Sequence, residues 1–139
     1  MTRRNARELI MQMLYEGTFH EAQEGERILS EQLNAIDNKE KNDNKAIIKF
    51  IQETYFGILE HLEEIDKLIA GTAENWSMSR ICKVDLSILR VAIYELKYTE
   101  VPVKVAVNEA LEIAKIYSTD KSPKFINGVL GKVIEVIEA

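Results

Sequence analysis

Apolar residues recur at intervals of three and four along almost the whole chain, and this spacing constrains the fold more than any other sequence feature. The longest run lies between residues 45 and 69 and has these apolar positions: Ile48, Ile51, Tyr55, Ile58, Leu59, Leu62, Ile65 and Ile69. Such a period places apolar side chains on one side of an α-helix. We therefore expect one long helix over about 45–69, which Gly71 and Thr72 end.

The same spacing predicts further helices and leaves two segments without a regular period. Helices are expected over residues 3–19, 26–36, 86–98, 103–117 and from 122 to the last residue. The polar run 37–45 is typical of a solvated loop, and 74–85 favours one or two short helical turns. Only two prolines and six glycines occur among 139 residues, which leaves little room for loops. The predicted fold class is all-α, a single domain built as a compact bundle of six or seven helices.

The motif VPVKVAV, residues 101–107, conflicts with this helical pattern. Its alternation of apolar and other residues is typical of a strand. Pro102 argues against a strand, because proline has no N–H to donate to a ladder. Helical spacing continues beyond the motif, so we expect the helix from about residue 103.

The motif SPKFINGVLG, residues 122–131, conflicts with it in a second way. Asn127 and Gly128 form a common turn signal, because both residues tolerate positive φ. Ser122 and Pro123 are instead typical of a helix start, where a hydroxyl accepts a backbone N–H and proline fits the first turn. We expect the Asn-Gly pair inside the last helix, where glycine costs about 1 kcal/mol relative to alanine.

Charge is distributed unevenly along the chain. The net charge of −5 argues against nucleic-acid binding, but residues 1–15 carry +2, residues 16–75 carry −8 and residues 76–139 carry +1. Both ends of the chain are therefore able to contribute to a local positive patch, which is what phosphate contacts require.

The sequence offers little to a catalytic or metal-binding hypothesis. Cys82 is the only cysteine, which excludes an intramolecular disulfide and favours a reducing compartment; it is expected to be a small buried hydrophobe. His20 and His61 have no cysteine or acidic partner at ligand spacing. Glu109 and Glu112 could form a carboxylate pair, but a solvated face is commoner. No catalytic motif occurs, so we expect no enzyme, no metal and no cofactor.

Targeting segments are also not expected. The start MTRRNAREL is charged like a secretory leader, but polar residues interrupt the stretch that follows it. No segment has the apolar length that spans a bilayer, so a cytoplasmic location is predicted.

Two residues favour structural roles. Trp76 is expected to anchor the core or a helix junction rather than contact a ligand. Arg90 lies among apolar residues and is expected to hold a buried acid such as Glu95 or Glu109, with Tyr94 at the same junction.

The basic residues at the two ends leave alternatives open. Arg3, Arg4 and Arg7 fit a solvated terminus and phosphate binding equally well. Lys121, Lys124 and Lys132 are equally ambiguous, although a helix N-terminus flanked by lysines favours anions.

The Asn-Gly pair leaves a similar choice. Gly128 permits the close approach of another backbone, either a neighbouring helix or a nucleic-acid strand. Asn127 is able to contact a base edge or to cap a neighbouring loop.

Five motifs together resemble the family of NusB-type transcription antitermination factors over nearly the whole chain. They are RRNAREL with LY at 14–15, W-x-x-x-R at 76–80, VDLSILRVAIYEL at 84–96, VPVKVAVNEALEIAK at 101–115 and SPKFINGVL at 122–130. Each is weak alone, but their common order and spacing make the match specific. The resemblance implies two packed three-helix subdomains, over about 1–72 and 73–139.

The resemblance also implies a non-enzymatic RNA-binding function. Family members bind boxA RNA together with the small-subunit ribosomal protein NusE, and they act with the RNA polymerase elongation complex and other Nus factors. The complex promotes read-through, notably in ribosomal RNA operons. Carried over by motif, the implied RNA-binding residues are Arg3, Arg4, Arg7, Lys104, Lys121, Lys124, Phe125, Asn127 and Gly128. Tyr15 and Asp85 match positions associated with the partner and RNA surface.

This sequence departs from the family at one point, and two other functions compete with antitermination. The stretch before the FxNG signature is often acidic in the family, whereas Lys121 stands there in this chain. One alternative is an RNA-recognition domain related to those of ribosomal RNA cytosine methyltransferases, which need a cofactor domain that 139 residues do not accommodate. The other is a pure protein adaptor, which predicts partner binding without dependence on RNA sequence.

Overall fold

Every regular element of the computed structural model is helical within the residues that it describes, 1–73 and 78–139. The elements in these ranges are α1 Arg3–Gly17, η1 Ala22–Glu24, α2 Gly25–Asn34, α3 Asn38–Asp43, α4 Lys45–Glu60, α5 Leu62–Thr72, η2 Met78–Arg80, α6 Lys83–Tyr98, α7 Val103–Tyr117 and α8 Ser122–Glu138. The all-α prediction is confirmed, and the described residues hold eight α-helices where six or seven were expected.

Both conflicts between local motifs and the helical period are resolved in favour of the helix. α7 begins at Val103, directly after Pro102, and continues to Tyr117, as predicted. Asn127 and Gly128 lie inside α8, which also confirms the prediction. Longer-range apolar spacing therefore outweighs both the strand-like alternation and the turn signal.

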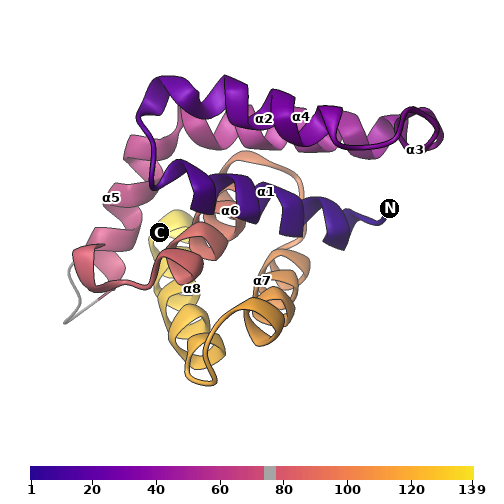
Figure 1. Ribbon diagram of the computed structural model, residues 1–139. Coiled ribbons are helices and arrows are strands. Elements are labelled where there is room, and N and C mark those ends of the chain that lie inside the picture. The colour runs from indigo at the N-terminus through magenta and orange to yellow at the C-terminus, as the bar shows by residue number, and fades with distance from the viewer. Residues whose placement is uncertain (74–77) are drawn as a thin grey trace.

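The expected long helix over 45–69 is wrong, because it is two helices that meet at His61. The His61 backbone has φ −105° and ψ 15°, and this residue ends α4 and precedes α5. Its ring stacks on Tyr98 of α6, with ring centroids 4.0 Å apart. Before the bend, α4 packs on α1 and α6. After it, α5 packs on α6 and α8 (Figure 1). Apolar spacing continues through such a bend and does not reveal it.

The expected loop over 37–45 is also wrong, because α3 occupies most of it. None of its residues is buried, which explains why no apolar period marks it. The Lys41 backbone N–H donates to the Asp37 carbonyl at 2.9 Å, and the Asn44 side chain donates to the Glu40 carbonyl at 2.7 Å. Local hydrogen bonds thus form a short surface helix that buries no side chain.

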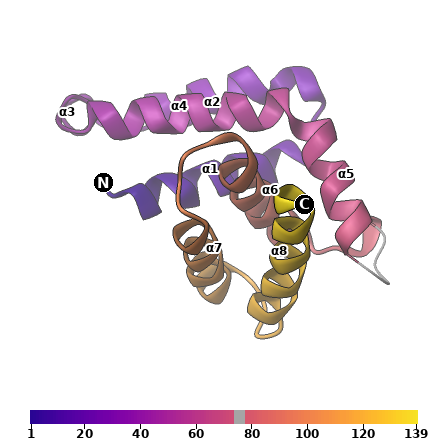
Figure 2. The ribbon, with the colours of Figure 1, turned by 180° about the vertical axis from the view of Figure 1, so that it is seen from behind.

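The helices are arranged around α1 and α6. Figures 1 and 2 show α2 and α4 on one side of α1, and α6, α7 and α8 on the other. α1 packs on α2, α4 and α6, while α6 packs on α1, α4, α5, α7 and α8. One cluster of buried apolar side chains runs through all of these contacts. Its largest fully buried members are Tyr55, Ile10, Met13, Ile28, Ile51, Ile58, Ile65, Ile69, Leu89, Ile93, Ile126 and Leu130.

Close contact between α4 and α6 depends on Gly57. A Cβ atom added at Gly57 lies 2.1 Å from the Tyr94 hydroxyl oxygen and 2.5 Å from Cζ of the same ring. Glycine is therefore required where the Tyr94 ring rests on the α4 backbone. Among the described helices, none is long and apolar enough to cross a membrane.

Candidate nucleic-acid interface

The N-terminal arginines are held by a well-defined helix start. The Thr2 hydroxyl accepts from the Asn5 backbone N–H at 3.0 Å, and the Asn5 side chain accepts from the Thr2 N–H at 2.9 Å. This capping box begins α1 at Arg3, with no acidic residue in its first turn. Cations at that end oppose the helix dipole, at a cost of about 0.3–1 kcal/mol each. The arginines therefore need compensating contacts elsewhere.

Arg7 forms an ion pair with a buried carboxylate, that of Glu95. Its Nε and Nη2 donate to the two oxygens of Glu95 at 2.8 and 2.9 Å. The Arg7 side chain is 6% exposed and that of Glu95 is 1% exposed. The Arg7 guanidinium is thus already paired in the core, and it ties α1 to α6 rather than facing solvent as a free cation.

Arg4 and Arg3 lie nearer the surface. Arg4 Nε donates to Glu109 Oε2 of α7 at 2.6 Å, and the hydrogen bond and charge of Glu109 raise the pKa of Arg4. The Arg4 side chain remains 43% exposed, so its outer N–H groups are able to reach a ligand. The Arg3 guanidinium lies 4.4 Å from the centre of the Phe50 ring, in a cation–π contact.

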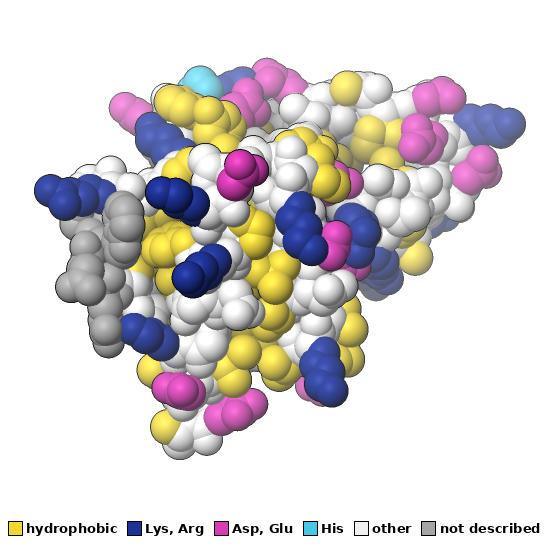
Figure 3. All heavy atoms as spheres, turned by 90° about the horizontal axis from the view of Figure 1, so that it is seen from below, with side chains coloured by type: hydrophobic (Ala, Val, Ile, Leu, Met, Phe, Trp, Pro, Cys, Tyr) yellow, Lys and Arg dark blue, Asp and Glu magenta, His cyan; other side chains and the backbone are white. Residues whose placement is uncertain are grey.

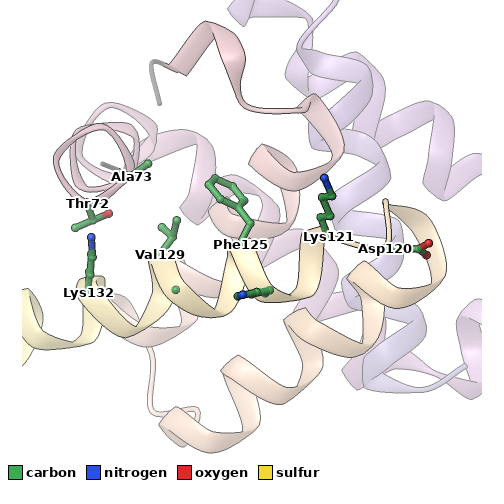
Figure 4. A pocket seen from close by; sticks show the side chains of 9 residues that line it. Thr72, Ala73, Asp120, Lys121, Phe125, Val129 and Lys132 are labelled. Atoms are coloured by element: carbon green, nitrogen blue, oxygen red, sulfur yellow. The ribbon is translucent and has the colours of Figure 1, made fainter. Parts of the chain in front are cut away.

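The first turns of α8 form one wall of a groove. The cavity has a volume of about 610 Å³ and is lined by Thr72, Ala73, Asp120, Lys121, Lys124, Phe125, Gly128, Val129 and Lys132. Figure 4 shows Phe125, Val129 and Lys132 pointing from α8 toward Thr72 and Ala73. Lys121 and Lys124 are exposed, and neither pairs with an acid among residues 1–73 and 78–139.

The Asn-Gly pair lies on the open side of α8. Asn127 and Gly128 are both exposed, and a Cβ added at Gly128 meets no described atom within 4 Å. No neighbouring helix in the described ranges therefore explains the glycine. Of the two interpretations of Gly128, packing between helices loses its support.

Asp85 is buried beneath this end of α8 instead of lying on the surface. It is 6% exposed, and its two oxygens accept from Ser118 Oγ at 2.5 Å and Ser122 Oγ at 3.0 Å. Ser122 Oγ also accepts from the Thr119 backbone N–H at 3.2 Å. The expected cap by Ser122 is wrong, since the Ser122 hydroxyl satisfies no α8 backbone N–H and binds Asp85 instead.

A second, smaller cavity adjoins the first. Its volume is about 240 Å³, and it is lined by Arg80, Ile81, Cys82, Asp85, Thr119, Lys121, Ser122 and Phe125. Lys121 and Phe125 line both cavities, so the two form a connected region around the start of α8. Cys82 is exposed there, which corrects the expectation of a buried hydrophobe.

The remaining predicted residues lie elsewhere on the surface. Lys104 is exposed in the first turn of α7. Tyr15 is 38% exposed near the end of α1, and its ring meets Phe19 edge-on at 5.2 Å between centroids. Phe19 in turn lies 4.1 Å from the Lys83 ammonium. Figure 3, viewed from below, shows several Lys and Arg side chains around exposed apolar surface.

The predicted RNA-binding residues thus fall into two groups. Arg3 and Arg4 lie at the start of α1, and Lys121 to Gly128 lie at the start of α8, with α7 between the two sites in both ribbon views (Figures 1 and 2). Arg80 is an exposed cation that lines the second cavity and that the sequence analysis did not assign. Its only signal was the W-x-x-x-R motif, which ends at Arg80.

Several other assignments change. Arg90 forms a structural ion pair as expected, but with Asp66, at 3.0 and 2.9 Å, and not with Glu95 or Glu109. Glu112 contacts Lys115 at 3.1 Å, so Glu109 and Glu112 each face a cation. Trp76 lies outside the described residues. Within the described ranges, no group of His, Cys, Asp and Glu could hold a metal ion.

Comparisons with known proteins give one consistent result. The NusB family model matches residues 4–135. A transcription antitermination protein NusB from Thermoanaerobacter sp. (strain X514) is 43% identical over 134 residues, 96% of this chain and 91% of that protein. One from Clostridium botulinum (strain Hall / ATCC 3502 / NCTC 13319 / Type A) is 45% identical over 143 residues, 96% of this chain and all of that protein.

Solved structures share the fold. T. maritima NusB superposes with a TM-score of 0.77 at 34% identity, over 97% of this chain and 92% of that chain. A chain from a crystal structure of the antitermination factors NusB and NusE with double-stranded RNA has a TM-score of 0.76 at 22% identity, over 96% of each chain. The family match, the relatives and the fold agree with the resemblance seen in the sequence, and the chain belongs to the NusB family.

Proposed function

We propose that this protein acts in transcription antitermination by binding boxA-type RNA together with the ribosomal protein NusE. Read-through by RNA polymerase, notably in ribosomal RNA operons and with other Nus factors, is the expected consequence. Its relatives are named as antitermination proteins, and one neighbour of the same fold was solved with NusE and RNA. The cytoplasm is the compartment that this role requires.

The start of α8 is the observation that carries the RNA-binding part. It combines two lysines that pair with no acid among the described residues, an aromatic side chain facing a groove, and a glycine beside which the described residues leave open space. Lysines contact phosphates, and an aromatic ring is able to stack on a base for about 1–3 kcal/mol. Phe125 is the proposed stacking residue, and Asn127 is the proposed contact to a base edge.

The arginines at the start of α1 extend the proposed site. Arg3 and Arg4 supply exposed guanidinium groups for phosphate, while Arg7 supports them through its buried pair with Glu95. Lys104, which is exposed in the first turn of α7, is a further proposed phosphate contact.

The partner is proposed from the charge of the remaining surface. Residues 16–75 carry a net charge of −8. Exposed carboxylates on α4 and α5 include Glu53, Glu60 and Glu63, and Phe56 of α4 is 43% exposed. This surface attracts a basic protein. NusE-type ribosomal protein is the proposed partner, and Tyr15 is a proposed contact for it or for the RNA.

The proposal is tested by RNA binding over a salt series, with and without the NusE-type protein. We expect tighter binding to boxA-type RNA than to a scrambled control, a further gain when the partner is added, and a salt slope that reports several phosphates. Lys124→Ala is expected to weaken binding and lower the slope. Lys45→Ala is the matched control, because Lys45 is an exposed lysine in the first turn of another helix.

Weak and equal binding to both RNAs in every condition contradicts the proposal. Binding to the NusE-type protein without any effect of RNA sequence then favours the protein-adaptor alternative. Equal losses for Lys124→Ala and Lys45→Ala show a diffuse electrostatic attraction instead of a site on α8.

A further inference from the structure

We infer that Asp85 is a positioning residue for the RNA-binding end of α8: its buried carboxylate fixes the turn that presents Lys121, Lys124 and Phe125. The inference rests on the proposed function and deepens it. It also gives Asp85 a role different from the surface contact that the family resemblance implies.

The Asp85 carboxylate is buried and needs hydrogen-bond partners. A charge that is removed from water is costly unless it is paired or hydrogen-bonded. No Lys, Arg or His within the described ranges pairs with Asp85, and hydroxyl groups on Ser118 and Ser122 satisfy its oxygens instead. These hydrogen bonds to a charged group hold the two serines firmly in place.

The hydrogen bonds of Asp85 connect three helices. Asp85 stands in the first turn of α6, yet no side chain caps that helix. Ser118 follows α7 and Ser122 begins α8, so one carboxylate joins three helices at the point where the chain reverses. Thr119 is held as well, because its backbone N–H donates to Ser122 Oγ.

The turn that Asp85 holds carries Lys121 and leads into the helix turn that carries Phe125. Lys121 precedes Ser122 directly, and Phe125 follows one turn later, with its backbone N–H bonded to the Lys121 carbonyl at 3.2 Å. Both residues line both cavities. A rigid turn holds these side chains before RNA arrives, so binding does not have to order them.

Asp85→Asn tests the inference, because asparagine keeps the shape and removes the charge. Ser122→Ala removes one bond of the cluster. Ser87→Ala is the matched control: Ser87 is fully buried on the same helix, but its hydroxyl donates to the Lys83 carbonyl within α6. Affinity for boxA-type RNA, the salt slope, the melting temperature and hydrogen exchange of α8 are measured for each variant.

We expect Asp85→Asn and Ser122→Ala to bind boxA-type RNA about fivefold more weakly than the wild type, an effect the size of one ordinary hydrogen bond. The salt slope is expected to fall by about one, because misplaced lysines contact fewer phosphates. Hydrogen exchange is expected to speed up in the first turn of α8 and to stay unchanged in α1. Ser87→Ala leaves affinity and slope at the wild-type value.

Three results overturn the inference. One is unchanged affinity in Asp85→Asn, and another is a loss of affinity with the wild-type salt slope, which indicates only a smaller folded fraction. The third is an equal effect of Ser87→Ala. If Asp85→Asn does not fold, Ser118→Ala and Ser122→Ala decide, since each removes a single hydroxyl.

Failure of the proposed function has a different signature. In that case the wild type does not distinguish boxA-type RNA from the scrambled control. The hydrogen-exchange comparison still reports whether Asp85 orders the start of α8, because that measurement needs no RNA.

Discussion

A side chain at Gly128 is expected to change stability and RNA binding in opposite directions. Gly128→Ala is expected to raise the free energy of unfolding by about 1 kcal/mol, because alanine favours the helix and the new Cβ meets no described atom. Affinity for boxA-type RNA is expected to fall, since the methyl group occupies space at the groove. Thermal melting and RNA titration measure the two effects.

Gly131→Ala is the matched control for this prediction. Gly131 is also exposed on α8, and a Cβ added there also meets no described atom within 4 Å, but it does not line the groove. It should gain similar stability and keep its RNA affinity. Equal RNA affinity in both variants would place the RNA away from Gly128.

The Arg7–Glu95 pair is expected to matter for stability more than any surface ion pair. Glu95→Gln removes the hydrogen-bonded counter-charge of the buried Arg7 guanidinium and leaves only the longer ion pair with Glu109 at 3.8 Å, at a cost of about 3 kcal/mol. Chemical denaturation measures the loss. Arg27→Ala, which removes exposed contacts with Glu24 and Glu31, should cost much less, because solvent screens exposed ion pairs. Similar losses in the two variants contradict the distinction.

Residue types predicted the chemistry of the candidate site better than its geometry. The sequence marked Arg7 and Asp85 as charged, but pairing depends on residues 88 positions away for Arg7 and 33 and 37 positions away for Asp85. Local spacing carries no information about such distant partners. Lys121 and Lys124 were easier to place, because a helix start that follows a Ser-Pro pair can be read locally.

At the scale of helices, Gly57 sets how closely α4 approaches α6. Gly57→Ala is expected to destabilise the fold by about 1–3 kcal/mol, because the new Cβ overlaps the Tyr94 ring. Gly71→Ala serves as the control, since a Cβ there meets no described atom within 4 Å. Combining Gly57→Ala with Tyr94→Leu should recover part of the loss if the overlap is the cause. Denaturation midpoints of the four proteins test this.

The contact between α5 and α6 is expected to weaken in alkaline solution. Burial and the hydrogen bond to Glu64 raise the pKa of Tyr98 to about 12, from 10.0 for an ordinary phenol. The folded state therefore favours the neutral phenol, and this contribution is complete below pH 10 and lost as the pH rises through about 12. Tyr98→Phe should reduce the fall in stability over that range. Identical pH profiles for the two proteins would exclude Tyr98 as the cause.

Helix existence was predictable from the sequence, whereas helix ends and bends were less so. α7 and α8 were placed correctly because apolar spacing and proline agree on their starts. The bend at His61 was missed because Leu62 and Ile65 continue the apolar period across it. α3 was missed because a helix that buries nothing leaves no such period.

At the scale of the whole molecule, the predicted boundary near residue 72 does not divide the core. α1 packs on α4 and equally on α6, and one apolar cluster joins both halves. We expect a single unfolding transition in urea, with coincident curves from circular dichroism and from hydrogen exchange of α4 and α7. Two separated transitions would show that the halves unfold independently.

The position of α1 also affects how the protein folds during synthesis. Arg7 of α1 pairs with Glu95, which lies 88 residues later in the chain, and Arg4 pairs with Glu109, which lies 105 residues later. α1 therefore completes its contacts only after α6 and α7 have been synthesised. Until then the part of its apolar face that packs on α6 is open to chaperones and to other nascent chains, whereas α2 and α4 are available earlier.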